Sequence, residues 1–193
     1  MIRIFNLTPL AGSLWRNCRN EKAAQIVEFA VSLPLLVLFV IGIFDFTGAL
    51  TLKQKLTNAA REAARIAAAD PGTDLGAAVP VSVSDAFQVL DNYLLAEKIN
   101  DCGLSTKTPS SSALLTWSAS STTGCPGIGI VFTINRGCMT LQSVGGVNTE
   151  VVNTCVTVQY AYQWRITGIS GVLGNSLTGP SSMTASAAAL NEN

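Results

Sequence analysis

The sequence predicts an α+β fold with a long N-terminal helix, a second, short helix and a small antiparallel sheet. Three patterns along the 193-residue chain support this prediction. One apolar run, at residues 29–44, is almost long enough to cross a membrane. A helical pattern continues from that run to Ala69. Beyond residue 71, apolar side chains alternate with polar ones in several short segments, as they do in half-buried strands.

The composition excludes several functional classes. The net charge is zero and only 12% of the residues are charged, whereas a nucleic-acid-binding protein would carry a clustered basic excess. The chain has no histidine, which excludes histidine-dependent triads and zinc sites that use imidazole. No serine–lysine pair or carboxylate pair forms a recognisable catalytic motif. We therefore expect a protein that is not an enzyme, needs no cofactor or metal, and binds no nucleic acid.

The apolar run is bounded by two acids. Residues 29–44 carry no charge and give about 24 Å of helix, whereas a bilayer core is about 30 Å thick. The helix can therefore span a bilayer only if Glu28 or Asp45 lies at the hydrocarbon boundary, at a cost of about 1–3 kcal/mol. Either both acids are hydrated at the interface, or Glu28 meets a cation of another chain inside the membrane. We predict a transmembrane helix over residues 24–51.

The helical pattern continues beyond the apolar run. Small and apolar residues recur at steps of three and four from Leu52 to Ile66, and Asp70-Pro71-Gly72 ends the pattern. Residues 24–69 can form one rod about 69 Å long, in which residues 52–70 continue the helix outside the membrane. A cleaved secretory signal would leave a mature N-terminus instead of a continuing helix. We therefore interpret the segment as an anchor.

The cysteines indicate disulfides in the part of the chain that follows the anchor. Cys102, Cys125, Cys138 and Cys155 are widely spaced and form no metal-binding pair, so two disulfides are favoured over a metal site. Three pairings are possible, of which the sequential one, Cys102–Cys125 and Cys138–Cys155, is preferred. The basic residues on the two sides of the anchor balance, so the positive-inside rule does not orient it. Disulfides require an oxidising compartment, which places the C-terminal domain outside the cytoplasm and Cys18 on the other side.

Residues 71–193 are predicted to form this outer α+β domain. Its expected elements are a helix that is capped by Ser82 or Ser84 and ends near Cys102, and strands near residues 114–118, 128–134, 155–166 and 181–190. The aromatic stripe Tyr160, Tyr162 and Trp164 follows the period of the buried strand face, so sheet packing is favoured over sugar binding. The glycine-rich segment 171–179 lacks the following helix or lysine that a phosphate site requires.

The N-terminal residues resemble a known family. The stretch "AAQIVEFAVSLPLLVLFVIGIFDF", followed by "LTNAAREAARIAA", is similar to TadE-like proteins, which are minor pseudopilins of the tight-adherence (Flp) pilus system. The resemblance covers residues 23–69 strongly and the C-terminal "SMTASAAAL" more loosely. It implies a pilin-like fold and a single-pass protein of the inner membrane, found there or within a pilus.

The resemblance also implies how the N-terminus is processed and used. A prepilin peptidase would cut between Ala23 and Ala24 and remove residues 1–23, a basic cytoplasmic leader. The family usually has Gly before the cut, so Ala23 is a departure. Glu28 would then be the fifth residue and would meet the freed α-amino group of a neighbouring subunit, which sets the register between helices. Asp45 has a counterpart in the family, but projects about 100° away from Glu28 around the helix and gains no role from this pairing.

The function that follows from the resemblance is a membrane-anchored component of tight-adherence pilus assembly. Its expected partners are the lipid bilayer, other pilin or pseudopilin subunits, the prepilin peptidase and an inner-membrane assembly platform. The alternative is a membrane-tethered extracytoplasmic binding or scaffold module that is unrelated to pili and keeps its leader. Whether the subunit enters the filament or only primes its assembly stays open at this stage.

Overall fold

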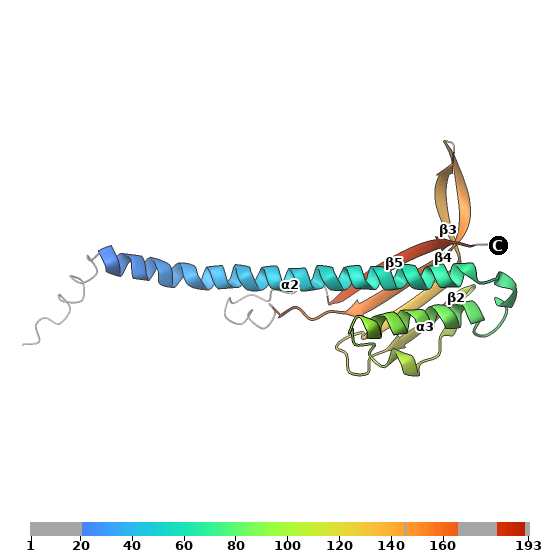
Figure 1. Ribbon diagram of the computed structural model, residues 1–193, viewed down its shortest axis with the longest axis horizontal. Coiled ribbons are helices and arrows are strands. Elements are labelled where there is room, and N and C mark those ends of the chain that lie inside the picture. Colours follow the sequence, from blue (N-terminus) through green and yellow to red (C-terminus); the bar gives the residue numbers. More distant parts are fainter. Residues whose placement is uncertain (1–20, 145, 166–180, 192–193) are drawn as a thin grey trace, which may run out of the picture. The chain divides into compact units, whose positions relative to one another are not determined.

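The computed structural model describes residues 21–144, 146–165 and 181–191. It confirms the α+β class, with a long N-terminal helix, a short second helix and an antiparallel sheet (Figure 1). The chain divides into two compact units, residues 1–44 and residues 45–193. Most of the predicted leader, Cys18, Ile166 at the end of the predicted third strand, and the glycine-rich segment 171–179 lie outside the described residues.

The N-terminal helix, α2, runs without interruption from Glu21 to Ala69. Pro34 lies inside the helix and does not end it. The helix ends before Pro71, where the fixed φ of proline and the following glycine favour a turn, and a short 3-10 helix, η1 (Gly72–Asp74), follows. The sequence pattern therefore predicted both the continuity and the end of this helix.

The remaining elements form a sheet with one further α-helix and a second 3-10 turn. These elements are α3 (Val81–Ala96), η2 (Leu104–Thr106), β1 (Ser110–Ala113), β2 (Thr116–Ser121), β3 (Ile130–Val144), β4 (Val147–Ala161) and β5 (Ser182–Leu190). The five strands lie in the order β1-β2-β3-β4-β5, and all neighbouring pairs are antiparallel. Each strand therefore pairs with the one that follows it in the chain, as in a meander.

The ends of α3 differ from those predicted. The helix begins at Val81, directly after Pro80, and the expected serine caps are not used. The carboxylate of Asp74 accepts a hydrogen bond from the Val81 N–H instead, at 2.5 Å. The helix ends at Ala96, well before Cys102, because Lys98 has a left-handed backbone with φ of 57°, which stops helical hydrogen bonding.

Three strands also differ from the sequence prediction. The single strand expected near Leu114 is a hairpin, in which β1 and β2 flank the Leu114-Leu115 turn. Strands β3 and β4 have 15 residues each and extend well beyond the predicted segments 128–134 and 155–166 at the hairpin that joins them. At its other end β4 stops at Ala161, so Tyr162 and Trp164 leave the sheet.

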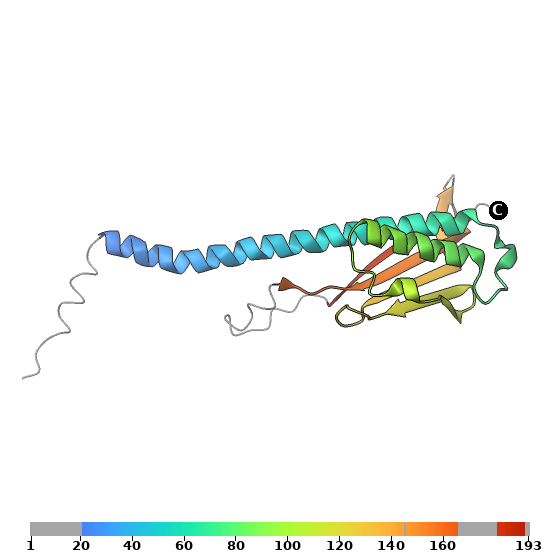
Figure 2. The same cartoon turned by 60° about the horizontal axis from the view of Figure 1, so that its bottom comes forward.

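The core of the outer unit lies between the sheet and two helices (Figures 1 and 2). One face of the second half of α2 is buried through small side chains, which allow the helix to approach its neighbours closely: Ala59, Ala60, Ala63, Ala64 and Ala67. In α3, Phe87 packs edge-to-face against Phe132 of β3, with ring centroids 5.8 Å apart. The segment 52–70, predicted to continue the membrane helix, is thus part of the core of the α+β domain.

Candidate functional site

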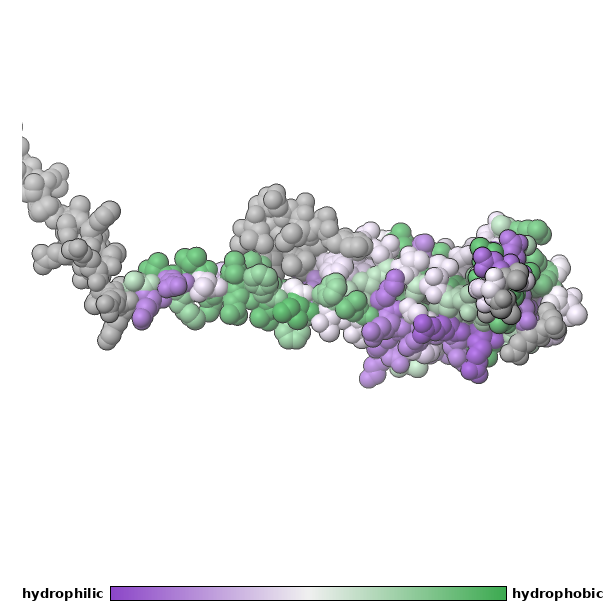
Figure 3. Space-filling model, turned by 90° about the horizontal axis from the view of Figure 1, so that it is seen from above, coloured by the Kyte–Doolittle hydropathy of each residue, from purple (hydrophilic) through white to green (hydrophobic). Residues whose placement is uncertain are grey.

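The first half of α2 exposes a continuous apolar surface. From Ile26 to Phe44 the large apolar side chains are exposed almost all around the helix. Figure 3 shows one face of this part of the helix, which is mostly hydrophobic. A helical stretch of this length with mean hydropathy 2.6 is long and apolar enough to cross a membrane. Exposed apolar surface of this extent marks a region that lipid or another protein covers. The structure thus bears out an N-terminal helix suited to be a membrane anchor.

Glu28 lies on this exposed part of α2, one helical turn after Ala24. Among the residues that the structure describes, no side chain forms a hydrogen bond or an ion pair with Glu28. Ala23 and Ala24 both lie in the first turns of the helix. Cleavage between them, and the pairing of Glu28 with a neighbouring chain, stay predictions.

Asp45 marks the point where α2 becomes part of the folded domain. Its side chain is only 4% exposed, whereas the apolar side chains before it face outward. The hydroxyl of Tyr162 donates toward both the backbone carbonyl oxygen and the Oδ1 atom of Asp45, each at 3.1 Å. A Cβ at Gly48, one turn further along, would lie 3.4 Å from the same hydroxyl. The small residue thus lets the tyrosine lie against the helix.

Tyr162 is held by a second aromatic residue. The ring of Trp164 packs edge-to-face on Tyr162, with centroids 5.0 Å apart. Burial, the hydrogen bond to Asp45 and the charge of that carboxylate raise the pKa of Tyr162, so the phenol stays protonated and remains a donor at neutral pH. The sequence predicted an aromatic stripe on a strand, but the structure places these two rings beyond β4, with Tyr162 against the helix that carries Asp45 and Trp164 packed on Tyr162.

The α+β domain contains both disulfides that the sequence favoured. Cys102–Cys125 joins the segment after α3 to the loop between β2 and β3, and its Cα atoms are 5.4 Å apart. Cys138–Cys155 joins β3 to β4 at an irregularity in their pairing, with Cα atoms 6.0 Å apart. Within the described ranges, no group of three or more acidic or cysteine side chains is placed to hold a metal ion.

A buried arginine connects the end of α2 to the sheet, and no pattern in its local sequence indicates this burial. Arg136 of β3 is almost fully buried, and its Nη2 atom donates to the backbone carbonyl of Asp70 at 2.9 Å. Burial lowers the pKa of Arg136, while the nearby carboxylates of Asp70 and Asp74 oppose this shift. The contact fixes the last turn of α2 against β3 and so contributes to the rigidity of the domain.

Comparison with known proteins identifies the family of the N-terminal segment. Residues 23–65 match the family model described as TadE-like protein. The match spans the exposed apolar half of α2 and most of its buried half, and it confirms the predicted resemblance. No curated protein and no solved structure gives a significant match to the chain.

Proposed function

We propose that this chain, TadE-like over residues 23–65, is a membrane-anchored minor pseudopilin of a tight-adherence pilus system. One observation carries the proposal: α2 is a single helix in which an exposed apolar half leads directly into a half that is buried in an α+β domain. Such a helix serves two purposes. It anchors the domain, and it presents a long lateral surface to other helices in the membrane. The second purpose is what a subunit of an assembly requires.

The position of Glu28 supports an assembly role. A carboxylate inside the hydrocarbon boundary costs about 1–3 kcal/mol when nothing neutralises it. Cleavage after Ala23 would create an α-amino group at Ala24. The amino group of one subunit can neutralise Glu28 of its neighbour at only one axial offset between the helices, so the ion pair selects a register more than it adds affinity.

Two features support an inner-membrane anchor with the domain on the outer side. The two disulfides are stable in an oxidising compartment, such as the periplasm, and rare in the cytoplasm. Tyr162, which packs on Trp164, donates a hydrogen bond to Asp45, the first buried residue of α2 after its exposed apolar stretch. Tyrosine and tryptophan are enriched where a membrane meets water. These rings support our proposal that the boundary of the bilayer lies near Asp45.

Processing of the N-terminus tests the proposal against a permanently tethered binding module. The full chain is expressed with and without a prepilin peptidase, and its intact mass and N-terminal sequence are measured. We expect a new N-terminus at Ala24 only when the peptidase is present. Ala23→Gly restores the usual family residue and should be cut faster, whereas Ala23→Leu should stay uncut. A leader that persists in both the native chain and Ala23→Gly contradicts the proposal and favours the tether.

The charge of Glu28 is tested separately, in the native host. Glu28→Gln keeps the size of the side chain and removes only its charge, so membrane insertion and disulfide formation should be unchanged while pilus output falls. Ser32→Ala, at an exposed position one turn further along α2, is the matched control and should leave piliation unchanged. Normal piliation in Glu28→Gln would remove the charge-pairing role.

A further inference from the structure

The hairpin between β3 and β4 extends beyond the rest of the sheet (Figure 1). Strand β2 pairs with β3 only as far as Asn135, and β5 pairs with β4 only as far as Asn153. Residues 138–144 of β3 and 147–152 of β4 therefore pair only with each other. We call this part the ribbon. In the part of the chain that the structure describes, both edges of the ribbon lack a neighbouring strand.

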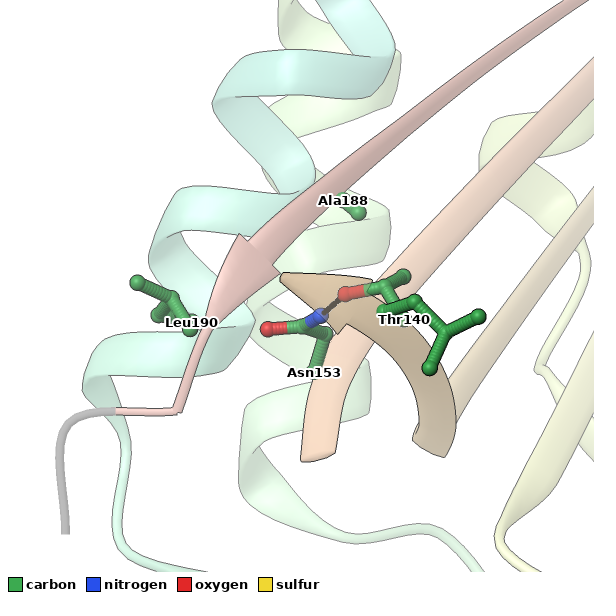
Figure 4. Close-up of a pocket in the computed structure, with 5 residues that line it drawn as sticks. Thr140, Asn153, Ala188 and Leu190 are labelled. Atoms are coloured by element: carbon green, nitrogen blue, oxygen red, sulfur yellow. Dashed lines mark hydrogen bonds between the residues drawn. The ribbon is translucent and has the colours of Figure 1, made fainter. Parts of the chain in front are cut away.

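The base of the ribbon is firmly held. The Cys138–Cys155 disulfide crosses it, and the side-chain amide of Asn153 donates to the hydroxyl of Thr140 (Figure 4). Asn191, after β5, accepts a hydrogen bond from the Thr154 hydroxyl and donates to the Arg136 carbonyl. The direction of the ribbon is thus fixed by a covalent bond and several hydrogen bonds, although a two-stranded ribbon alone is marginally stable in water.

The ribbon carries exposed apolar side chains and almost no charge. Met139 and Leu141 lie on the same face of β3 and are 68% and 73% exposed, and Val152, opposite Met139, is 49% exposed. Glu150 is the one charged residue between positions 138 and 152, and this segment has no lysine or proline. Soluble proteins usually protect a free strand edge with lysine, proline or a cover. Among the described residues, neither edge of the ribbon has a lysine, a proline or a cover, so each edge is open to pairing with a further strand.

The distribution of charge favours the β3 edge, and the self-complementarity of an antiparallel edge suits a second copy of the chain as its partner. Glu150 lies on β4, so two copies that met through β4 would bring like charges together. Residues 138–144 of β3 carry no charge. An antiparallel strand edge is complementary to itself about a twofold axis, because each edge alternates donors and acceptors. Two β3 edges can therefore pair without repulsion, and their Met139 and Leu141 side chains then form one shared apolar face.

We propose that the ribbon is a dimerisation arm: β3 of one chain pairs antiparallel with β3 of a second copy and forms a four-stranded sheet. The pairing needs neither removal of the leader nor the Glu28 contact, so it does not rest on the proposed function. A shallow pocket of about 290 Å³ lies at the base of the ribbon and is lined by Thr140, Leu141, Asn153, Ala188 and Leu190.

Cross-linking of the full chain in its native membrane tests this arm. In a Cys18→Ser background, single cysteines replace Met139, Leu141 or Ser143, all on one face of β3, and a short bismaleimide is added. We expect at least one position to give a product of twice the mass. The control is Leu114→Cys, which is 89% exposed in the β1–β2 turn and should cross-link at least about fivefold less. Formation of both native disulfides verifies that each variant folds.

A charge on each edge then separates specific pairing from chance collision. Ser143 on β3 and Asn148 on β4 are cross-strand partners, so they lie at the same level of the ribbon. Ser143→Lys therefore adds a charge to the β3 edge, and Asn148→Lys adds the same charge to the β4 edge. Ser143→Lys, combined with the best cross-linking position among Met139 and Leu141, should lower the dimer yield by about fivefold, whereas Asn148→Lys should change it little. The proposal would be overturned if the two lysines lowered the dimer yield equally, or if no ribbon position gave more cross-linked dimer than the Leu114→Cys control. A cross-linked product with a different protein would also overturn it.

Discussion

The contact between Tyr162 and Asp45 allows a quantitative prediction. Tyr162→Phe removes only the hydroxyl that donates to the Asp45 carboxylate and carbonyl at 3.1 Å. The acceptor is 4% exposed, so water cannot replace the lost donor without local opening of the structure. Loss of a hydrogen bond to a charged group lowers the free energy of unfolding by about 1.5–3 kcal/mol. For a unit of the size of residues 45–193, this corresponds to a fall in Tm of about 3–12 °C.

Tyr160→Phe provides a matched control two residues away. Its hydroxyl donates to the backbone carbonyl of Asn100 at 3.0 Å, which is a neutral and more exposed acceptor. Loss of this bond should lower the free energy of unfolding by only about 0.5–1.5 kcal/mol. Thermal unfolding of the full chain in detergent, followed by tryptophan fluorescence at pH 7, measures both variants. Equal falls in Tm would refute the reasoning that the buried carboxylate is what makes Tyr162 important.

The pH dependence gives an independent check. The pKa of Tyr162 is raised in the folded protein above its ordinary value of 10.0, so the folded state holds this proton more tightly than the unfolded state. Its contribution to stability is therefore complete below about pH 10 and is lost as the pH rises through the folded pKa. Tyr162→Phe should lose less stability than the native chain between neutral pH and this alkaline range. The same alkaline loss in both proteins would contradict the predicted linkage.

Three further predictions test the α+β domain by thermal unfolding. Burial and the nearby carboxylate of Asp101 raise the pKa of Asp91, so ionisation of Asp91 above about pH 4 destabilises the fold. Asp91→Asn should therefore raise Tm at pH 7, and this gain should vanish near pH 3. Gly129→Ala should lower the free energy of unfolding by about 3 kcal/mol or more, because the new Cβ would lie 2.1 Å from a backbone oxygen of β2. Gly127→Ala is the control: its Cβ would meet free space, so only the φ of 57° is unfavourable, and the loss should be about 1–2 kcal/mol. Replacement of both Cys138 and Cys155 by serine opens a loop with a sequence separation of 17 and should lower the free energy of unfolding by about 3 kcal/mol. An unchanged Tm would show that this disulfide does not stabilise the domain.

The elements that the sequence predicted correctly are those with a local cause. The period of α2 and the proline and glycine that follow it lie next to each other in the chain. The closing strand β5 was likewise predicted from its own residues. The preferred disulfide pairing joins cysteines that are only 23 and 17 residues apart. In each case the residues that form the feature are close in sequence.

The features that the sequence missed depend on residues that are distant in the chain. Tyr162 and Asp45 are 117 residues apart, and nothing in either local segment indicates their contact. The cap of α3 comes from Asp74, seven residues before Val81, instead of a serine at the helix start. The burial of Arg136 depends on the end of α2, 66 residues earlier. The extension of β3 and β4 beyond their neighbours is also set by pairing, since residues 138–152 show no regular alternation of their own.

The burial pattern of α2 separates two tasks within one helix. Before Asp45, the large apolar residues that the structure describes are mostly exposed, and none of them belongs to the domain core. From Leu56 to Ala67, the buried alanines are fixed by packing against the domain. The family match covers both halves and ends within the second, whereas the sheet lies outside it. The region similar to the TadE-like family is therefore the exposed apolar part of α2 together with the helix face that packs in the domain, and the sheet with its ribbon lies outside this similarity.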